Sequence, residues 1–101
     1  MNRRRLIAAV HPGEYLRELL EELGLSQYRV ARDLGVAPMR ISHLIRRQRP
    51  VTAEMALRLG RYFGQSPRYW LNLQSRYDMD ITEQNLGTKV DREVRPFKAV
   101  A

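Results

Sequence analysis

The sequence predicts an all-α protein of five short helices in one domain. Apolar residues recur at intervals of three and four along most of the chain, which is the periodicity of an amphipathic helix. Glycine, serine and proline interrupt these stretches where helices are expected to end and begin. The length of 101 residues suits a single domain that buries roughly two-thirds of its extended surface.

The first two helices are predicted from their ends and their apolar faces. The first runs from about Pro12 to Leu23 and stops at Gly24. Ser26 caps the second helix, and Gly35 ends it. The side chains expected to point inward are Leu16, Leu19, Leu20, Leu23, Val30, Ala31 and Leu34.

The other three helices follow a similar logic. Pro38 opens the third and Pro50 ends it. Thr52 caps the fourth, Gly64 closes it, and the pair at 66–67 begins the fifth. The apolar residues expected on these helices are Ile41, Leu44, Ile45, Met55, Ala56, Leu59, Phe63, Trp70, Leu71, Leu73 and Tyr77.

The chain is expected to divide into a basic arm (residues 1–10), a helical domain (11–80) and a C-terminal tail (81–101). The apolar residues of the tail are sparse, and several residues favour a broken helix. These are Asn85, Gly87, Asp91 and Pro96. We therefore expect an irregular tail, held either by the helical domain or by a second copy of the chain.

The charge of the chain points to nucleic acid. The formal net charge is +7 and the isoelectric point is near 10.5, and small basic proteins commonly bind nucleic acid. Composition does not separate DNA from RNA.

Other partners and cofactors are not expected. Without cysteine there is no disulfide or thiolate metal site, and His11 and His43 lie far apart in the sequence, so we predict no metal and no cofactor. No apolar run approaches the ~18 residues of a transmembrane span. The apolar stretch after the basic start ends at His11, too early for a signal peptide, so a cytoplasmic protein without a membrane partner is expected.

A helix-turn-helix motif is indicated by the spacing of five residues. Gln27, Ala31, Gly35, Ile41 and Leu44 combine a small residue at the helix crossing, a glycine at the turn and two apolar anchors for the third helix. This arrangement leaves Met39, Arg40, Ser42, His43 and Arg46 facing outward. The second helix of such a motif lies in the major groove of DNA.

Positive charge is concentrated around that third helix. Residues 36–49 contain Arg40, Arg46, Arg47 and Arg49 and no acidic residue, whereas the first helix carries four glutamates. We expect Arg40 to bind guanine and the later arginines to bind phosphates. The alternative is a solvated arginine face on a bundle that binds no nucleic acid.

Two histidines allow different interpretations. His43 either donates to a base or phosphate or is ordinary surface, and the sequence favours neither. His11, at the start of the first helix, is interpreted as a helix cap rather than as a catalytic or metal-binding residue.

Two segments, HPGEYLRELLEELGLSQYRVARDLGV and TAEMALRLGRYFGQSPRYWLNLQSRYD, carry a family resemblance. Over about residues 11–80 the chain resembles the HigA antitoxins, a branch of the lambda-repressor-like, XRE-type helix-turn-helix proteins. The resemblance implies a cytoplasmic homodimer that binds a palindromic operator in its own promoter as a repressor. It also implies a protein partner, a small HigB-like toxin that cleaves mRNA on the ribosome.

The resemblance also implies roles for individual residues. Gln27 contacts phosphate, and Pro38, Met39, Arg40 and His43 face the groove. The full set of predicted DNA-binding residues is Gln27, Pro38, Met39, Arg40, Ser42, His43, Arg46, Arg47 and Arg49. The fifth helix, with Trp70, Leu73 and Tyr77, corresponds to a region that contributes to dimerisation.

The turn after the third helix departs from the family pattern. The family has an Asn-Gly-Lys-Arg type of turn, and this chain has Arg46-Arg47-Gln48-Arg49. Without the glycine, either the third helix runs longer or Arg47 adopts a strained left-handed conformation.

Two other classes of function are considered. A free-standing XRE-type transcriptional regulator has the same DNA contacts and no toxin partner. An enzyme is not expected, because the sequence shows no nucleophile and base at recognisable spacing, no glycine-rich phosphate loop and no metal cluster.

Overall fold

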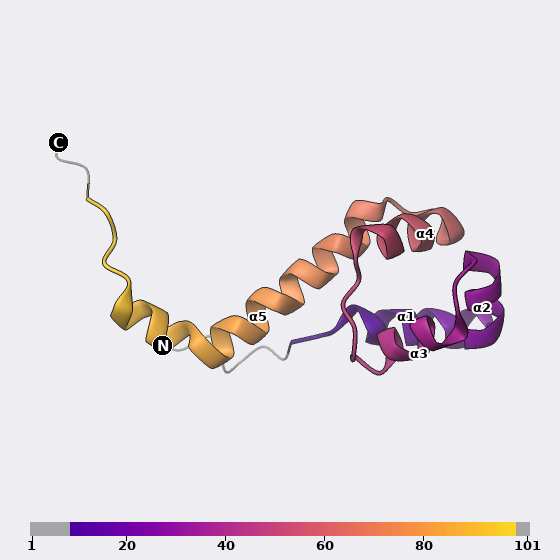
Figure 1. The fold of residues 1–101 in the computed structure, drawn as a ribbon, viewed down its shortest axis with the longest axis horizontal. Helices are drawn as coiled ribbons and strands as arrows, with labels where there is room; N and C mark the ends of the chain where they lie inside the picture. The colour runs from indigo at the N-terminus through magenta and orange to yellow at the C-terminus, as the bar shows by residue number, and fades with distance from the viewer. Residues whose placement is uncertain (1–8, 99–101) are drawn as a thin grey trace.

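The computed structural model describes residues 9–98, and five α-helices occupy most of that range. They are α1 (Pro12–Leu23), α2 (Gln27–Leu34), α3 (Pro38–Ile45), α4 (Ala53–Phe63) and α5 (Pro67–Glu93) (Figure 1). No strand occurs between residues 9 and 98, and the predicted five-helix all-α fold is confirmed. The arginines at 3–5 of the basic arm lie outside the described residues.

Local capping explains where most helices begin. Ser26, Thr52 and Ser66 each accept a hydrogen bond from a backbone amide in the first turn of α2, α4 and α5, at 3.0, 3.2 and 3.2 Å. For α1, the Nδ1 atom of His11 accepts from the Gly13 amide at 2.9 Å. The interpretation of His11 as a helix cap is therefore confirmed.

The core lies between the short helices and the first turns of α5. Trp70 is its largest fully buried side chain, and its indole N–H donates to Gln65 Oε1 at 2.8 Å. The other buried apolar residues are Leu16, Leu20, Val30, Ala31, Leu34, Ile41, Leu44, Val51, Met55, Ala56 and Leu59. Leu23 was expected in this core, but as the last residue of α1 it is 55% exposed.

The start of α1 and the end of α3 approach each other very closely. A Cβ atom at Gly13 would overlap the backbone carbonyl oxygen of Leu44. Only glycine permits this contact. It places the N-terminus of α1 directly against the last turn of α3.

The irregular tail expected from residue 81 is wrong for residues 81–93, which continue α5 to Glu93. One glycine inside a helix costs only about 1 kcal/mol, and asparagine and aspartate cost less, so Asn85, Gly87 and Asp91 do not end it. Pro96, the strongest helix breaker of the segment, lies beyond the last turn.

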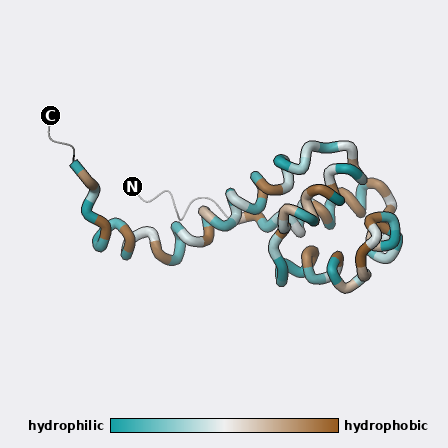
Figure 2. Tube along the Cα trace, turned by 45° about the horizontal axis from the view of Figure 1, so that its top comes forward, coloured by the Kyte–Doolittle hydropathy of each residue, from teal (hydrophilic) through white to brown (hydrophobic). Residues whose placement is uncertain are grey.

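The second half of α5 projects from the group formed by the other helices, giving extents of 57 × 28 × 20 Å (Figure 1). Near its start, Trp70 and Gln74 are buried, whereas Leu86 and Val90 farther along are about half exposed. Apolar segments gather where the short helices face one another and recur along the projecting helix (Figure 2). Across residues 9–98, we find no helix with both the length and the apolar character to cross a membrane.

Candidate nucleic-acid interface

α2 and α3 form the predicted helix-turn-helix. Ala31 is fully buried at the crossing, and Ile41 and Leu44 anchor the inner face of α3 with exposed fractions of 0% and 2%. Because Ile41 and Leu44 point inward, the opposite face of α3 is presented to solvent. The predicted burial of these three positions is confirmed.

The turn between α2 and α3, here called the glycine turn, is centred on Gly35 with φ of 75°. The Val36 amide donates to the Ala31 carbonyl at 3.0 Å, and the Gly35 amide donates to the Arg32 carbonyl at 3.2 Å. This pair of bonds is a Schellman motif, which satisfies the last carbonyls of α2 and turns the chain into α3.

The exposed face of α3 begins with Pro38 and Met39, and Met39 is 64% exposed. Ser42 and His43 lie half-buried, about one turn later. Gln27 is exposed at the first position of α2. α3 therefore offers an apolar, a hydroxyl and an imidazole group, and the amide of Gln27 lies on the preceding helix of the motif.

The turn after α3, here called the arginine turn (residues 46–48), answers the question raised by the missing glycine. α3 ends at Ile45 rather than continuing to Pro50, and Arg47 takes φ of 62°. Between residues 9 and 98 it is the only non-glycine residue with positive φ. Of the two alternatives left open by the sequence, strain at Arg47 is the one observed, and the arginines at 46, 47 and 49 are all exposed.

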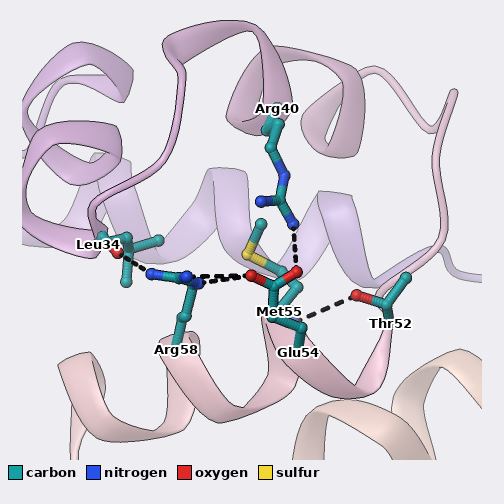
Figure 3. Close-up of polar contacts among 6 residues, drawn as sticks. All are labelled: Leu34, Arg40, Thr52, Glu54, Met55 and Arg58. Carbon is teal, nitrogen blue, oxygen red and sulfur yellow. Dashed lines mark hydrogen bonds and ion pairs between the residues drawn. The ribbon is translucent and has the colours of Figure 1, made fainter.

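Arg40 points toward the start of α4 (Figure 3). Its Nη2 atom lies 3.4 Å from Glu54 Oε1, and Glu54 also accepts hydrogen bonds from Arg58 at 3.0 and 3.1 Å. Arg58 donates in turn to the Leu34 carbonyl at 2.8 Å. The hydrogen bond from Arg58, followed by the positive charge of Arg40, lowers the pKa of Glu54, so this carboxylate is ionised at neutral pH.

A second acidic group binds α2 to α4. The Tyr62 hydroxyl donates to Asp33 at 2.6 Å, and Arg29 pairs with the same carboxylate at 3.5 Å. These contacts lower the pKa of Asp33, the tyrosine hydrogen bond most strongly. The two carboxylates, Asp33 and Glu54, therefore tie α4 to the helix-turn-helix.

His11 lies behind the arginine turn. It is 3% exposed, and its ring makes an edge contact with Tyr77 of α5 at a centroid distance of 4.8 Å. Burial lowers the pKa of His11, and the nearby positive charge of Arg47 lowers it further. The imidazole is thus held neutral, as its role as acceptor for the Gly13 amide requires.

Comparison with known proteins agrees with this geometry. The Helix-turn-helix family model matches residues 16–70. Virulence-associated protein I of Dichelobacter nodosus is 50% identical over 78 residues, which cover 76% of this chain and 72% of that protein.

Two solved structures extend the comparison beyond the motif. An addiction module antidote protein of a HigA family from Coxiella burnetii is 37% identical, with a TM-score of 0.88 over 90% of this chain and 100% of that one. The Pseudomonas aeruginosa antitoxin HigA, solved with the higBA promoter, is 39% identical, with a TM-score of 0.86 over the same shares of the two chains. The chain belongs to the HigA-type helix-turn-helix family.

The dimer residues predicted for this HigA-type chain separate into two kinds. Trp70 has no exposed surface in the single chain, so it packs the core rather than contacting a second copy, and its assignment to the interface is corrected. Leu73 and Tyr77 are half-buried and keep exposed surface on α5. Their place in an interface stays a prediction.

Sequence reasoning missed Glu54 and Arg58, which contact Arg40 and Leu34 in the candidate site of this HigA-type chain. Their spacing of four residues on a helix was a usable signal for an ion pair between them. Nothing local linked that pair to Arg40, which lies on another helix, 14 residues from Glu54. The predicted DNA-binding residues share one region around α3, and their contacts with DNA stay a prediction.

Proposed function

We propose that this protein is an operator-binding antitoxin that represses its own operon and neutralises a HigB-like toxin. The observation that carries the proposal is the exposed face of α3, followed by an arginine turn that retains a cation at a strained position. The similarity to the Pseudomonas aeruginosa antitoxin HigA, solved with its higBA promoter, supports the same use of that face.

In this function α3 enters the major groove, and its side chains divide into two roles. Arg40 donates to guanine, while Met39 offers an apolar contact to a thymine methyl group and His43 a hydrogen bond. Gln27 and the exposed arginines at 46, 47 and 49 contact phosphates, which position the domain without reading sequence.

A homodimer is part of the proposal because one such domain reads few base pairs. Paired recognition helices bind half-sites that lie about 34 to 36 Å apart, one turn of DNA, so a second copy must be held at that distance. Leu73 and Tyr77 with the exposed apolar residues of the projecting helix, Met79, Leu86 and Val90, are the surface proposed for that contact.

The DNA-binding part is tested by comparing two arginine variants on two duplexes. The probes are a duplex selected by the wild-type chain from a random library and a scrambled duplex of equal length. Arg40→Ala is expected to lower the preference between them, since a bidentate pair with guanine contributes about 1–3 kcal/mol of discrimination. Arg47→Ala is expected to weaken both duplexes alike and to lower the salt slope by about one.

The matched control is Arg17→Ala, which removes an equal charge from an exposed site on α1. It is expected to change neither measurement. Equal loss of affinity on both duplexes for Arg40→Ala would show that Arg40 does not read bases.

The toxin is proposed to bind the acidic side of α1. Glu18, Glu21 and Glu22 are exposed there, and Glu14 is half-buried. A toxin that acts on the ribosome is expected to be basic, so an acidic surface away from α3 is complementary and leaves DNA binding possible in the complex.

Co-expression with the product of the adjacent reading frame tests this surface. Reversing Glu18 and Glu22 to lysine is expected to abolish co-purification while binding of the selected duplex survives. Retention of the partner by that variant would exclude α1. Absence of any partner with the wild-type chain would favour the free-standing regulator.

A further inference from the structure

Glu54 lies on α4, and its carboxylate is held in place by contacts with α4 and α2 that are separate from its contact with α3. Arg58 donates to Glu54 Oε2 through Nε at 3.1 Å and through Nη2 at 3.0 Å. The remaining Arg58 nitrogen, Nη1, donates to the Leu34 carbonyl at 2.8 Å, at the end of α2 (Figure 3). Two short bonds on one carboxylate oxygen and one on a backbone carbonyl define the position of Glu54 relative to the glycine turn.

The contact with Arg40 uses the other carboxylate oxygen. Arg40 Nη2 lies 3.4 Å from Glu54 Oε1, and the Arg40 side chain remains 41% exposed. A guanidinium has five N–H donors in a rigid plane, so a contact through Nη2 leaves donors on Nε and Nη1. Glu54 therefore restricts the direction of the guanidinium without occupying all of its donors.

Restriction matters for an arginine that is expected to read a base. An arginine side chain loses conformational freedom when it is immobilised in an interface, and a residue already oriented loses less. A bidentate pair with guanine also needs a defined plane, whereas a phosphate accepts a cation from many directions. A fixed carboxylate beside the guanidinium therefore favours base contacts over phosphate contacts.

We propose that Glu54 is a positioning residue for sequence recognition, which orients Arg40 toward base edges and reduces its attraction to the DNA backbone. This inference rests on the proposed operator binding. It differs from a purely structural role, in which Glu54 would only favour the N-terminus of α4 and pair with Arg58. A structural role changes stability and leaves the ratio of affinities for two DNA sequences unchanged.

The test is a double-mutant cycle between Glu54→Gln and Arg40→Gln. Affinities are measured by fluorescence anisotropy for the selected duplex and for the scrambled duplex of equal length. Glu54→Gln is expected to lower the ratio of the two affinities about five- to tenfold, a part of the discrimination available from one arginine–guanine pair. In the Arg40→Gln background the same substitution is expected to leave the ratio unchanged.

Glu93→Gln is the matched control, since it removes the same charge from an exposed site at the end of α5. An equal fall of the affinity ratio in this control would overturn the proposal, because Glu54 would then act through net charge alone. An equal fall in the Arg40→Gln background would also overturn it, because Glu54 would then act through groups other than Arg40. If Glu54→Gln leaves the affinity ratio unchanged in the chain that keeps Arg40, the proposal is also overturned. A wild-type chain without preference for any duplex would instead refute the proposed function.

A second variant covers the case in which Glu54→Gln does not fold. Arg58→Lys keeps the charge and loses the planar donors that hold Glu54, so a smaller fall in the same ratio is expected. Thermal unfolding is measured for every variant. Selection of duplexes by a folded variant should then show relaxed preference at one base pair in each half-site, and unchanged preference there would contradict the proposal.

Discussion

The two turns at the ends of α3 have the same hydrogen-bond pattern and different residues at the position of positive φ. In the glycine turn, Gly35 has φ of 75°, and in the arginine turn, Arg47 has φ of 62°. The amide that follows each of them donates five residues back, at 3.0 Å in the glycine turn and 2.8 Å in the arginine turn. The two turns share one backbone geometry, so they differ in the conformational free energy that this geometry costs.

That cost differs because a side chain opposes the left-handed conformation. A non-glycine residue in this region loses roughly 1–2 kcal/mol. The arginine turn is stabilised by the surrounding structure instead. Gly13 packs against the Leu44 carbonyl, and the buried His11 lies close enough for the Arg47 charge to lower its pKa. We infer that the fold tolerates strain where a cation faces the proposed DNA surface.

The largest expected effect comes from giving the glycine turn a side chain. Gly35→Ala is expected to lower the free energy of unfolding by about 1–2 kcal/mol, because alanine disfavours positive φ. The added Cβ would have only an ordinary contact, 3.5 Å from Arg58 Nη1, so the cost comes from the backbone. Urea unfolding followed by circular dichroism measures it.

Gly24→Ala is the control for this substitution. Gly24 has φ of 66°, and an added Cβ would have no neighbour within 4 Å. It is expected to cost the same stability without affecting DNA binding. A much larger loss for Gly35→Ala than for Gly24→Ala would show that the glycine turn depends on more than its backbone conformation.

The reverse exchange in the arginine turn is expected to stabilise the fold by a smaller amount. Arg47→Gly relieves the strain but adds freedom to the unfolded chain, so the net gain is about 0.5–1 kcal/mol. The same unfolding experiment measures the gain, and binding to both duplexes should weaken together. A loss of stability would mean that the Arg47 side chain makes contacts that outweigh its strain.

The smallest expected effect is a loss of stability at low pH, which tests the packing of His11 behind the arginine turn. The pKa of His11 lies below its ordinary value of 6.5, so the unfolded chain binds this proton more readily than the folded chain. The contribution of His11 to stability is complete above about pH 6.5 and declines as the pH falls toward the folded-state pKa. Urea unfolding at pH 7.5 and at lower pH measures the decline.

Two variants test whether His11 causes that decline in stability. In His11→Asn, whose amide oxygen can cap α1, the decline is expected to be smaller than in the wild-type chain. Arg47→Gly should also reduce it, because the Arg47 charge is the second cause of the lowered pKa. If both variants lose as much stability at low pH as the wild-type chain does, other titrating groups cause the decline.

The sequence by itself determined the features that depend on neighbouring residues. Ser26, Thr52 and Ser66 cap helices at the predicted places, and Gly24, Gly35 and Gly64 end them. A cap acts within one turn, and positive φ acts on a single residue, so both are readable from a few adjacent letters. The spacing of Ala31, Ile41 and Leu44 identified the helix-turn-helix for the same reason.

Only the tertiary structure decided the features in which small local preferences compete or distant residues meet. α5 continues through Gly87 because the local cost of that glycine is less than the loss of a continuous helix. Trp70 could serve a core or an interface by its pattern, and burial assigned it to the core. Arg40, Glu54 and Leu34 meet through helix packing, which depends on the path of the whole chain and not on any one stretch of it.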